Sequence, residues 1–498
     1  MKTYRPYAPS QSYLLPPSPS EWLPESHLAY FILDLVEDLN LSEIEAPMQR
    51  KDPRGEKAFS PRMMTALLLY GYAVGLTSSR KLEKATFEDV PLRVLAAGEH
   101  PHFTTINEFR AIHRAALGGL FQQVLEECMS AGLVTLGHVA IDGTKMKANA
   151  SKHKAMSHER MVKEDEKLSS EIQAYFDEAE AVDAEEDKLY GVGEQQHDLP
   201  AELRRREDRR AKIREVREAL KKETAKKRAA ELETLAEELR AKADDPTTSV
   251  KKQGEFETVA ARHDQQAAEI DDDDDLPPPT VDDDLPRNTP PRKPDGTPKP
   301  KAQRNFTDPD SRLMMRDGAF VQAYNAQIAV DESTQIIVAA ALSNQAPDVE
   351  YFEPMLERVV ENCSAVPART TADSGYFSAS NVAAAEAMGT QPFIAAGGHR
   401  RDGLPDEEST HVQHQTAAKR EMRALLETPA GHAAYARRKA TVEPVFGQIK
   451  ACRGIRQMSF RGLWKNRCEW LLICATHNVL KLWRSASRAT PRLALAAG

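Results

Sequence analysis

The 498 residues of this chain are enough for two or three domains, and 41% apolar with 29% charged residues is ordinary for a globular protein with a large core. No apolar run reaches the roughly 18 residues that a membrane-spanning helix needs. The first twenty residues are rich in proline and tyrosine and lack the apolar centre of a signal peptide. We therefore expect a cytoplasmic protein without a membrane partner. The net charge of −9 excludes no class of partner, because a locally basic region can still bind phosphates.

The N-terminal region, residues 1–133, is predicted to be an all-α domain. Pro61 opens a largely apolar helix, and a turn over 75–79 leads into a second helix that carries Arg80. A third helix begins near Thr104, with a basic residue one turn further on. Short helices with basic first turns suit a bundle that docks onto DNA, and we expect Arg80 to contact DNA. The alternative is that these helices only pack against one another.

A long charged segment follows the first predicted strand. Residues 134–150 contain that strand, and beyond it residues 151–245 are rich in Glu, Lys, Arg and Ala, which predicts a helical hairpin or a short coiled coil. Residues 246–304 are acidic and proline-rich, with five consecutive aspartates at 271–275, and are predicted to be a disordered linker. The five cysteines form no Cys-x-x-Cys pair, so we expect free, buried thiols.

Strand periodicity returns after residue 305. Apolar and polar residues alternate over 324–330, and after a turn a largely apolar segment follows over 335–341. This pattern predicts a β-hairpin. The elements that follow are a helix over 349–362, a strand over 369–373, a helix over 380–388, a strand over 391–396 and further helices after 415. An antiparallel meander joined to parallel strands through helices is the order of a ribonuclease-H-like α/β fold with a mixed sheet and flanking helices.

We therefore predict one core that is divided along the chain. Its first strand lies in 134–150 and the remainder in 305–484, so that the helical and disordered insertion over 151–304 splits it. The all-α domain precedes it, and a tail over 485–498 follows.

Three carboxylates stand at informative places in this order of elements. Asp142 ends the first strand and Asp373 ends the fourth, so both would meet at one edge of the sheet. Glu443 is predicted to open the following helix, because a proline disfavours helical geometry in the residue before it. Three converging carboxylates suit Mg²⁺, and two such ions about 4 Å apart can promote in-line displacement at phosphorus. Each acid alone also fits a turn or a helix N-terminus.

One other use of the first acid is excluded. The stretch Asp142-Gly143-Thr144 is similar to the end of the Asp-x-Asp-Gly-Thr motif, whose first Asp is a phosphatase nucleophile. Ala140 stands at the position of that nucleophile in this chain.

Several motifs resemble those of DDE-class transposases of bacterial insertion sequences. They are Ser-Pro-Arg-Met at 60–63, Tyr-Asn-Ala-Gln at 324–327, Ala-Asp-Ser-Gly-Tyr-Phe-Ser at 372–378, Val-Glu-Pro-Val-Phe-Gly-Gln-Ile-Lys at 442–450 and His-Asn at 477–478. The chain is similar to the branch called, in words, the IS eleven-eighty-two group, which carries its insertion between the first and second Asp. The resemblance implies that Asp142, Asp373 and Glu443 are catalytic and bind two Mg²⁺ ions, for which Mn²⁺ would substitute.

The same resemblance implies a Tyr-Arg-Glu-Lys signature around the Glu. This chain offers Tyr435, Arg438, Glu443 and Lys450, with four residues rather than three between Arg438 and Glu443, so that Lys439 stands where the Arg is expected. Lys450 lies two turns beyond Glu443 and is expected to hold a DNA phosphate, as are the neighbouring cations.

A basic stretch continues from this signature. Eleven Lys or Arg stand against two acids over 433–484. Five of them follow Lys450 closely, namely Arg453, Arg456, Arg461, Lys465 and Arg467, and we expect this surface, Arg453 included, to bind the DNA backbone. His477 has no second metal-binding side chain at ligand spacing and is predicted to be structural.

The predicted activity is metal-dependent cleavage of insertion-sequence ends and transfer of the freed 3′-hydroxyl into target DNA. The implied partners are double-stranded DNA, as terminal inverted repeats and as target, and a second copy of the chain in a homodimer on paired ends. Two alternatives remain open: a nuclease on the same fold, and a transposase-derived DNA-binding protein without catalysis.

Overall fold

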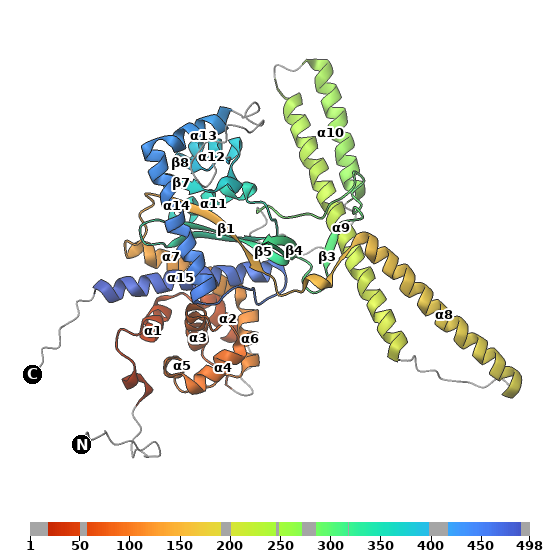
Figure 1. Ribbon diagram of the computed structural model, residues 1–498, viewed down its shortest axis with the longest axis horizontal. Coiled ribbons are helices and arrows are strands. Elements are labelled where there is room, and N and C mark those ends of the chain that lie inside the picture. The colour runs from red at the N-terminus through yellow and green to blue at the C-terminus, as the bar shows by residue number, and fades with distance from the viewer. Residues whose placement is uncertain are drawn as a thin grey trace, which may run out of the picture.

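The computed structural model describes residues 18–49, 57–190, 201–245, 249–270, 285–316, 318–397 and 417–489. The predicted acidic run at 271–284 and most of the predicted tail lie outside these residues. Three regions are visible in Figure 1: a helical bundle at the N-terminal end, a sheet with covering helices, and a pair of long helical arms that project from one side. Within the described ranges, no helix is both long enough and apolar enough to cross a membrane.

The N-terminal bundle is helical, as predicted. Its α-helices are α1 (Leu28–Asp38), α2 (Ser42–Gln49), α3 (Pro61–Val74), α4 (Ser79–Glu88), α5 (Val90–Leu95), α6 (Phe103–Ile112) and α7 (Arg114–Ser130). Helix α3 begins at Pro61, where the missing N–H costs nothing, and it is buried over most of its length. It ends at Gly75, whose φ of 85° favours glycine. A side chain at Gly75 would also collide with the carbonyl of Arg453 from the C-terminal part of the chain.

The sheet combines antiparallel and parallel strands, which confirms the predicted mixed sheet. Its strands are β1 (Val139–Lys147), β4 (Arg312–Arg316), β5 (Ala319–Asp331), β6 (Ile337–Ser343), β7 (Arg369–Ala372) and β8 (Gln391–Ile394). Their order is β4-β5-β1-β7-β8, and β6 also pairs with β5. Strands β5 and β6 form the predicted hairpin, whereas β4 and a separate two-stranded ladder of β2 (Ala155–Ser157) and β3 (Gln303–Asn305) were not predicted.

Strand β1 lies at the centre of this sheet and sets its register. It pairs antiparallel with β5 along its whole length and parallel with the start of β7. In the parallel ladder Ala140 lies opposite Thr371, so that two residues further along each strand Asp142 and Asp373 emerge next to each other. The core around them is apolar: Val139, Ala140 and Ile141 are fully buried.

Helices cover the sheet and join it to the bundle. They are α11 (Phe352–Cys363), α12 (Ala379–Met388), α13 (Ala417–Glu427), α14 (Pro429–Gly447), a π-helical turn (Gln448–Cys452) and α15 (Leu463–Ala489). Helix α15 packs against α3, α7 and β6. A buried polar chain crosses the same interface, because the Tyr72 hydroxyl donates to Glu469 at 2.8 Å and Arg110 donates to Tyr72 at 3.1 Å.

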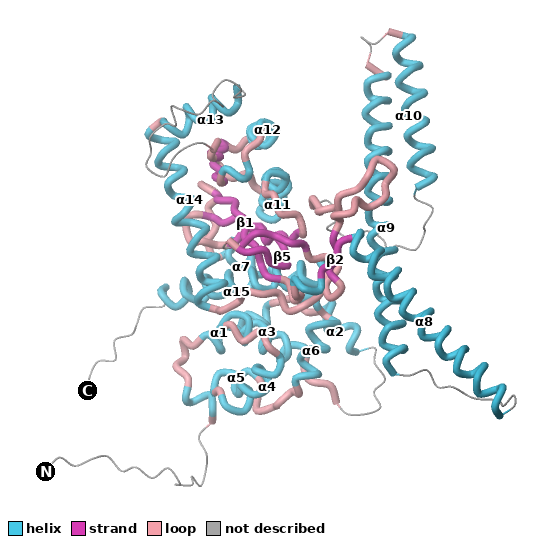
Figure 2. Tube along the Cα trace, turned by 45° about the vertical axis from the view of Figure 1, so that its right-hand side comes forward, coloured by secondary structure: helices cyan, strands magenta, loops and turns pink. Residues whose placement is uncertain are grey.

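Long helices connect β1 to the rest of the sheet along the chain. Helix α9 (Ala201–Ala243) pairs with α8 (His158–Tyr190) at one end and with α10 (Val250–Ile270) at the other, so that two hairpins point in different directions (Figure 2). Asp165 of α8 accepts hydrogen bonds from Arg210, Arg214 and Arg217 of α9, with its closest donor at 2.9 Å. These ion pairs and a small apolar cluster around Met161 and Ile213 hold the first hairpin together.

Part of the predicted linker is ordered. Residues 250–270 form α10 rather than disordered chain, because Ala260 and Ala267 lie at helical spacing and bury against α9. Residues 285–304 are described as well: Leu285 is buried, and the segment ends in β3. The expectation of disorder over 246–304 is therefore wrong for α10 and for 285–304, and composition missed them because the contacts come from residues far apart in sequence.

Candidate active site

Asp142 is held at the sheet edge by its own backbone and by α14. Its Oδ1 accepts from the Gly143 amide at 2.8 Å, and its Oδ2 accepts from Arg438 Nη1 at 2.9 Å. Burial raises the pKa of Asp142 to about 6; the Asp373 charge also raises it, and Arg438 opposes both. The carboxylate is thus desolvated and close to a second carboxylate, which is how a cation-binding site alters its ligands in the absence of the cation.

Asp373 lies at the end of β7 and caps the short turn that follows. Its Oδ1 accepts from the Gly375 amide at 2.8 Å, which fixes the carboxylate in place. The structure therefore brings Asp142 and Asp373 together, as their positions at the ends of neighbouring strands predicted.

Glu443 is placed differently from the prediction. It lies within α14, four residues before its end, and its side chain is exposed. The helix continues through Pro444 because the carbonyl of Ala440, which loses its N–H partner to the proline, accepts from Gln335 Nε2 at 2.9 Å instead. The prediction that a helix begins at Glu443 is therefore wrong, and Glu443 does not join the Asp142–Asp373 pair in this conformation.

The donor set fits a divalent cation in part. Among the described residues, no group of three His, Cys, Asp or Glu side chains is close enough to hold a metal ion. Mg²⁺ is commonly held by one or two carboxylates together with substrate phosphate oxygens and water, and Asp142 with Asp373 supplies two. The residues present therefore fit a cation that completes its coordination with phosphate, while Glu443 stays outside.

Cationic and aromatic side chains of α14 and the π-helical turn face the same side of β1 as Asp142. Arg438 stacks on the Tyr435 ring, with 5.8 Å between the guanidinium carbon and the ring centroid. Lys450 donates to Thr144 Oγ1 and to the Lys145 carbonyl. Successive side chains of a strand alternate between faces, so Asp142 and Thr144 share the face that these residues cover.

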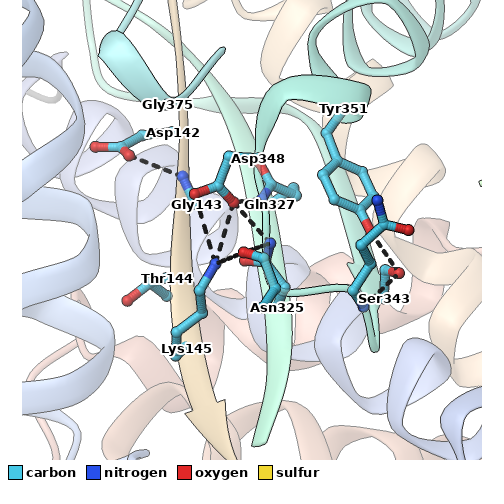
Figure 3. A network of polar contacts seen from close by, with 12 residues as sticks. Asp142, Gly143, Thr144, Lys145, Asn325, Gln327, Ser343, Asp348, Tyr351 and Gly375 are labelled. Atoms are coloured by element: carbon cyan, nitrogen blue, oxygen red, sulfur yellow. Dashed lines mark hydrogen bonds and ion pairs between the residues drawn. The ribbon is translucent and has the colours of Figure 1, made fainter. Parts of the chain in front are cut away.

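The opposite face of β1 carries a polar network that sequence reasoning missed. Asp348, in the loop before α11, accepts from Lys145 Nζ at 3.1 Å, Asn325 Nδ2 at 2.6 Å and Gln327 Nε2 at 2.8 Å (Figure 3). Tyr376, three residues after Asp373, donates to Gln327 Oε1. The Asp348 carboxylate thus ties β1 to β5, and Gln327 links the same network to the turn after β7, behind the Asp142–Asp373 pair.

Two glycines make room for this network. A Cβ on Gly143 would collide with Gln327 Nε2 and lie 3.0 Å from Asp348 Oδ1. A Cβ on Gly375 would lie 3.0 Å from Asp373 Oδ1 and 3.7 Å from the Asp348 Cβ. Close packing against this network, and not only the geometry of a turn, therefore explains the glycines of the Asp-Gly and Asp-Ser-Gly sequences.

The signal for this network was present in the sequence. Asn325 and Gln327 are polar residues that alternate with apolar ones in the middle of a strand, and both are fully buried. Buried amides need hydrogen-bond partners, so they predicted a polar acceptor in the core, although only the fold shows that the acceptor is Asp348. Tyr324 on the same strand likewise donates to Asp308 at 2.8 Å.

The other predicted DNA-binding residues have different surroundings. Arg80 is exposed, 4.8 Å from the Phe103 ring centroid, and Lys439 is exposed on α14. Arg453 is buried and donates to Thr476 Oγ1 at 2.8 Å and to the Tyr72 and Ile473 carbonyls. Its role in the structure is to join α3 to α15, which argues against the predicted contact with DNA. Arg467 is also buried, against the Leu342 carbonyl.

Further predictions concern His477 and the cysteines. His477 is buried, and its Nε2 lies 2.9 Å from the Gln335 carbonyl; burial lowers its pKa to about 3, as suits a structural histidine. All five cysteines are free, but only Cys128, Cys468 and Cys474 are buried, and Cys452 is exposed.

Two family models match the chain. One is described as Transposase DDE domain and covers residues 293–479, and the other is Transposase domain (DUF772) and covers residues 17–111. No curated protein and no solved structure gives a significant match. The two matched domains support a DDE transposase; transposase domains imply DNA as a partner, and the DDE domain implies a ribonuclease-H-like fold.

The matched ranges and the structure complement each other. Asp373 and Glu443 lie inside the matched DDE region, whereas Asp142 lies outside it. In the fold, Asp142 joins that region through the pairing of β1 with β5 and β7 and through the hydrogen bond that it accepts from Arg438.

Proposed function

We propose that this chain is the transposase of an insertion sequence of the IS eleven-eighty-two group, which cleaves the element's ends and transfers the freed 3′-hydroxyl to target DNA. The observation that carries the proposal is the adjacency of Asp142 and Asp373 at the edge of a mixed sheet whose remainder matches a transposase DDE domain. The family uses divalent metal ions, and an edge with two adjacent carboxylates is suited to phosphoryl transfer.

The residues around the pair have separable roles in this proposal. Divalent ions held by Asp142 and Asp373 would supply activation of the attacking oxygen and stabilisation of the leaving one. Arg438, stacked on Tyr435, lies beside the pair and is suited to bind a phosphate oxygen there. Lys450, fixed at Thr144 two residues along β1, is suited to the next phosphate. Catalysis by such a site rests on positioning and charge stabilisation.

Glu443 would join the site on binding of DNA and metal. It is exposed, and it lies on the same helix as Arg438, so a rotation of α14 that releases Arg438 from Asp142 would also move Glu443. The N-terminal bundle, with exposed Arg80, is proposed to bind terminal DNA as part of a homodimer that pairs two ends.

The experiment uses the full chain and a supercoiled plasmid that carries the gene with its flanking DNA. We expect breaks at discrete flanking positions in the presence of Mg²⁺ or Mn²⁺, followed by joined products. Asp142→Asn, Asp373→Asn and Glu443→Gln should each abolish cleavage and retain DNA binding. Breaks that persist in Asp373→Asn would refute the site assignment.

The two other functions are separated by the same plasmid. A nuclease on this fold would give metal-dependent breaks without joined products. A silent DNA-binding protein would bind the flanks with or without Mg²⁺ and give no breaks. The position of Glu443 away from the Asp142–Asp373 pair is the observation that favours this alternative.

A further inference from the structure

Four cations gather at the C-terminal end of β1. They are Lys147, Arg316, Arg456 and Arg461, and we call them the β1 cation cluster. The Arg456 carbonyl accepts from the Lys147 amide at 3.4 Å and from Arg316 Nη1 at 3.4 Å, which brings three of them around one peptide group. Arg461 Nε donates to the Asn149 carbonyl at 3.4 Å.

The backbone fixes these cations relative to Asp142. Residues 456–459 run alongside β1 as a short parallel bridge in which Gln457 lies opposite Lys147. The Met458 amide donates to the Lys147 carbonyl at 2.8 Å, and Asn149 Nδ2 donates to the Ser459 carbonyl at 2.8 Å. The cluster is thus built on strand-like backbone rather than on a loose loop.

The cluster faces solvent as a net positive surface. Lys147, Arg456 and Arg461 are exposed, and within the described part of the chain none of these three forms an ion pair. The carboxylates beside the segment accept backbone or side-chain hydrogen bonds: the buried Asp308 accepts from Tyr324 and the Gly462 amide, and the half-buried Asp310 accepts from the Leu463 amide. A surface with exposed cations beside hydrogen-bonded acids is complementary to a polyanion.

The distance from Asp142 indicates where that polyanion lies. A strand rises about 3.3 Å per residue, so Lys147, the last residue of β1, stands about 17 Å along the strand from Asp142. Asn149 follows two residues after the strand and lies at most about 7 Å further, at about 23 Å. Base pairs of B-DNA are 3.4 Å apart, so these distances correspond to about five and seven base pairs. Lys450, bound to Thr144, lies along β1 between the Asp pair and the cluster.

We infer that the β1 cation cluster binds the backbone of duplex DNA about five to seven base pairs from the phosphate that is cut, with the DNA running along β1. This inference rests on the proposed function, because it takes the Asp142–Asp373 pair as the place of cleavage. It goes beyond the basic stretch expected from sequence, since it adds Lys147 and Arg316 and leaves out the buried Arg453 and Arg467.

The first test measures the affinity of the full chain for a 40-base-pair duplex as salt is raised. Each phosphate contact contributes about 0.9 to the slope of log affinity against log salt. Arg456→Gln and Arg461→Gln should each lower the slope by about that amount, and the triple variant with Lys147→Gln by about 2.7. Lys163→Gln, which removes an exposed cation of α8, is the matched control and should leave the slope unchanged.

A slope that stays the same in the triple variant, with an unaltered melting temperature, would overturn the inference. This readout needs no cleavage, so it stands even where the plasmid experiment gives no breaks and the proposed function fails.

The second test locates the contact once the cut has been mapped. Neutral methylphosphonate linkages at the fifth to seventh positions from the cut should weaken binding of the unaltered chain. The same linkages should cost the triple variant little, because its partner cations are gone. An equal loss in both proteins would place the cluster elsewhere on the DNA and refute the inferred path.

Discussion

The Arg438 guanidinium lies 2.9 Å from the carboxylate of Asp142, and both side chains are largely buried. Arg438 precedes Glu443 by five residues, about 140° around a helix, so the face of α14 that meets the Asp pair presents a cation while Glu443 faces outward. In this conformation the guanidinium of Arg438 therefore supplies the positive charge beside Asp142. The attraction of one cation does not fully offset the free energy lost when the carboxylate is removed from water. The pKa of Asp142 is therefore still raised.

The first prediction follows from this cost. The pKa of Asp142 is about 6 in the folded protein against an ordinary 3.8, so between these values the folded state binds more protons than the unfolded state and stability falls as pH rises. A shift of about two units corresponds to about 3 kcal/mol at neutral pH. Asp142→Asn should therefore raise the melting temperature at pH 7, and the gain should shrink below pH 6 and vanish near pH 4.

Melting curves from pH 4 to pH 8 check this expectation. Asp34→Asn, a change at an exposed acid of α1, serves as the control and should show no such window. A melting temperature lowered by Asp142→Asn at pH 7 would mean that the unpaired Arg438 outweighs the relief of burial.

Much of the site followed from the order of strands. Asp142 and Asp373 each end a strand, and parallel neighbours bring such ends to one edge, so their proximity needed no side-chain detail. Glu443 was misplaced because Pro444 normally ends or begins a helix, and the sequence does not reveal that Gln335, more than a hundred residues earlier, satisfies the freed carbonyl.

The direction of side chains was harder to predict than the position of strands. A count of basic residues does not separate Arg453, which points into the interface with α3, from Arg456, which points to solvent. Asp348 was missed for a related reason: it stands in a loop, and its role depends on donors from two strands that only the folded sheet brings together.

A second prediction concerns the space behind the Asp pair. Gly143→Ala would place a methyl group against Gln327 and Asp348, within a packed polar network, and force the catalytic end of β1 to shift. We expect DNA cleavage to fall at least tenfold, since small displacements of reacting groups have large effects on rate. Plasmid cleavage measures the rate, and circular dichroism measures the fold.

Gly119→Ala is the matched control, because a Cβ there has no neighbour within 4 Å and the residue lies inside α7. Replacement of a helical glycine by alanine should stabilise the protein by about 0.5–1 kcal/mol and leave cleavage unchanged. Equal loss of cleavage in both variants would show that the effect of Gly143→Ala is not local.

The third prediction concerns Asp348. Asp348→Ala removes the common acceptor of Lys145, Asn325 and Gln327 and leaves their donors in a site that is largely closed to water. Each unsatisfied buried donor costs about 1–3 kcal/mol, so we expect a loss of about 2–5 kcal/mol in the free energy of unfolding, measured in urea. Glu350→Ala, two residues further on and exposed, should cost less than about 0.5 kcal/mol.

A double variant tests whether the loss comes from the network itself. Lys145→Met in the background of Asp348→Ala removes the charged donor that has lost its partner, so part of the stability should return. Hydrogen exchange at β1 should change in parallel, with faster exchange in Asp348→Ala and partial recovery in the double variant. If the two changes were simply additive, Lys145 and Asp348 would be energetically independent, and the 3.1 Å contact between them would not be what fixes β1 behind the Asp142–Asp373 pair.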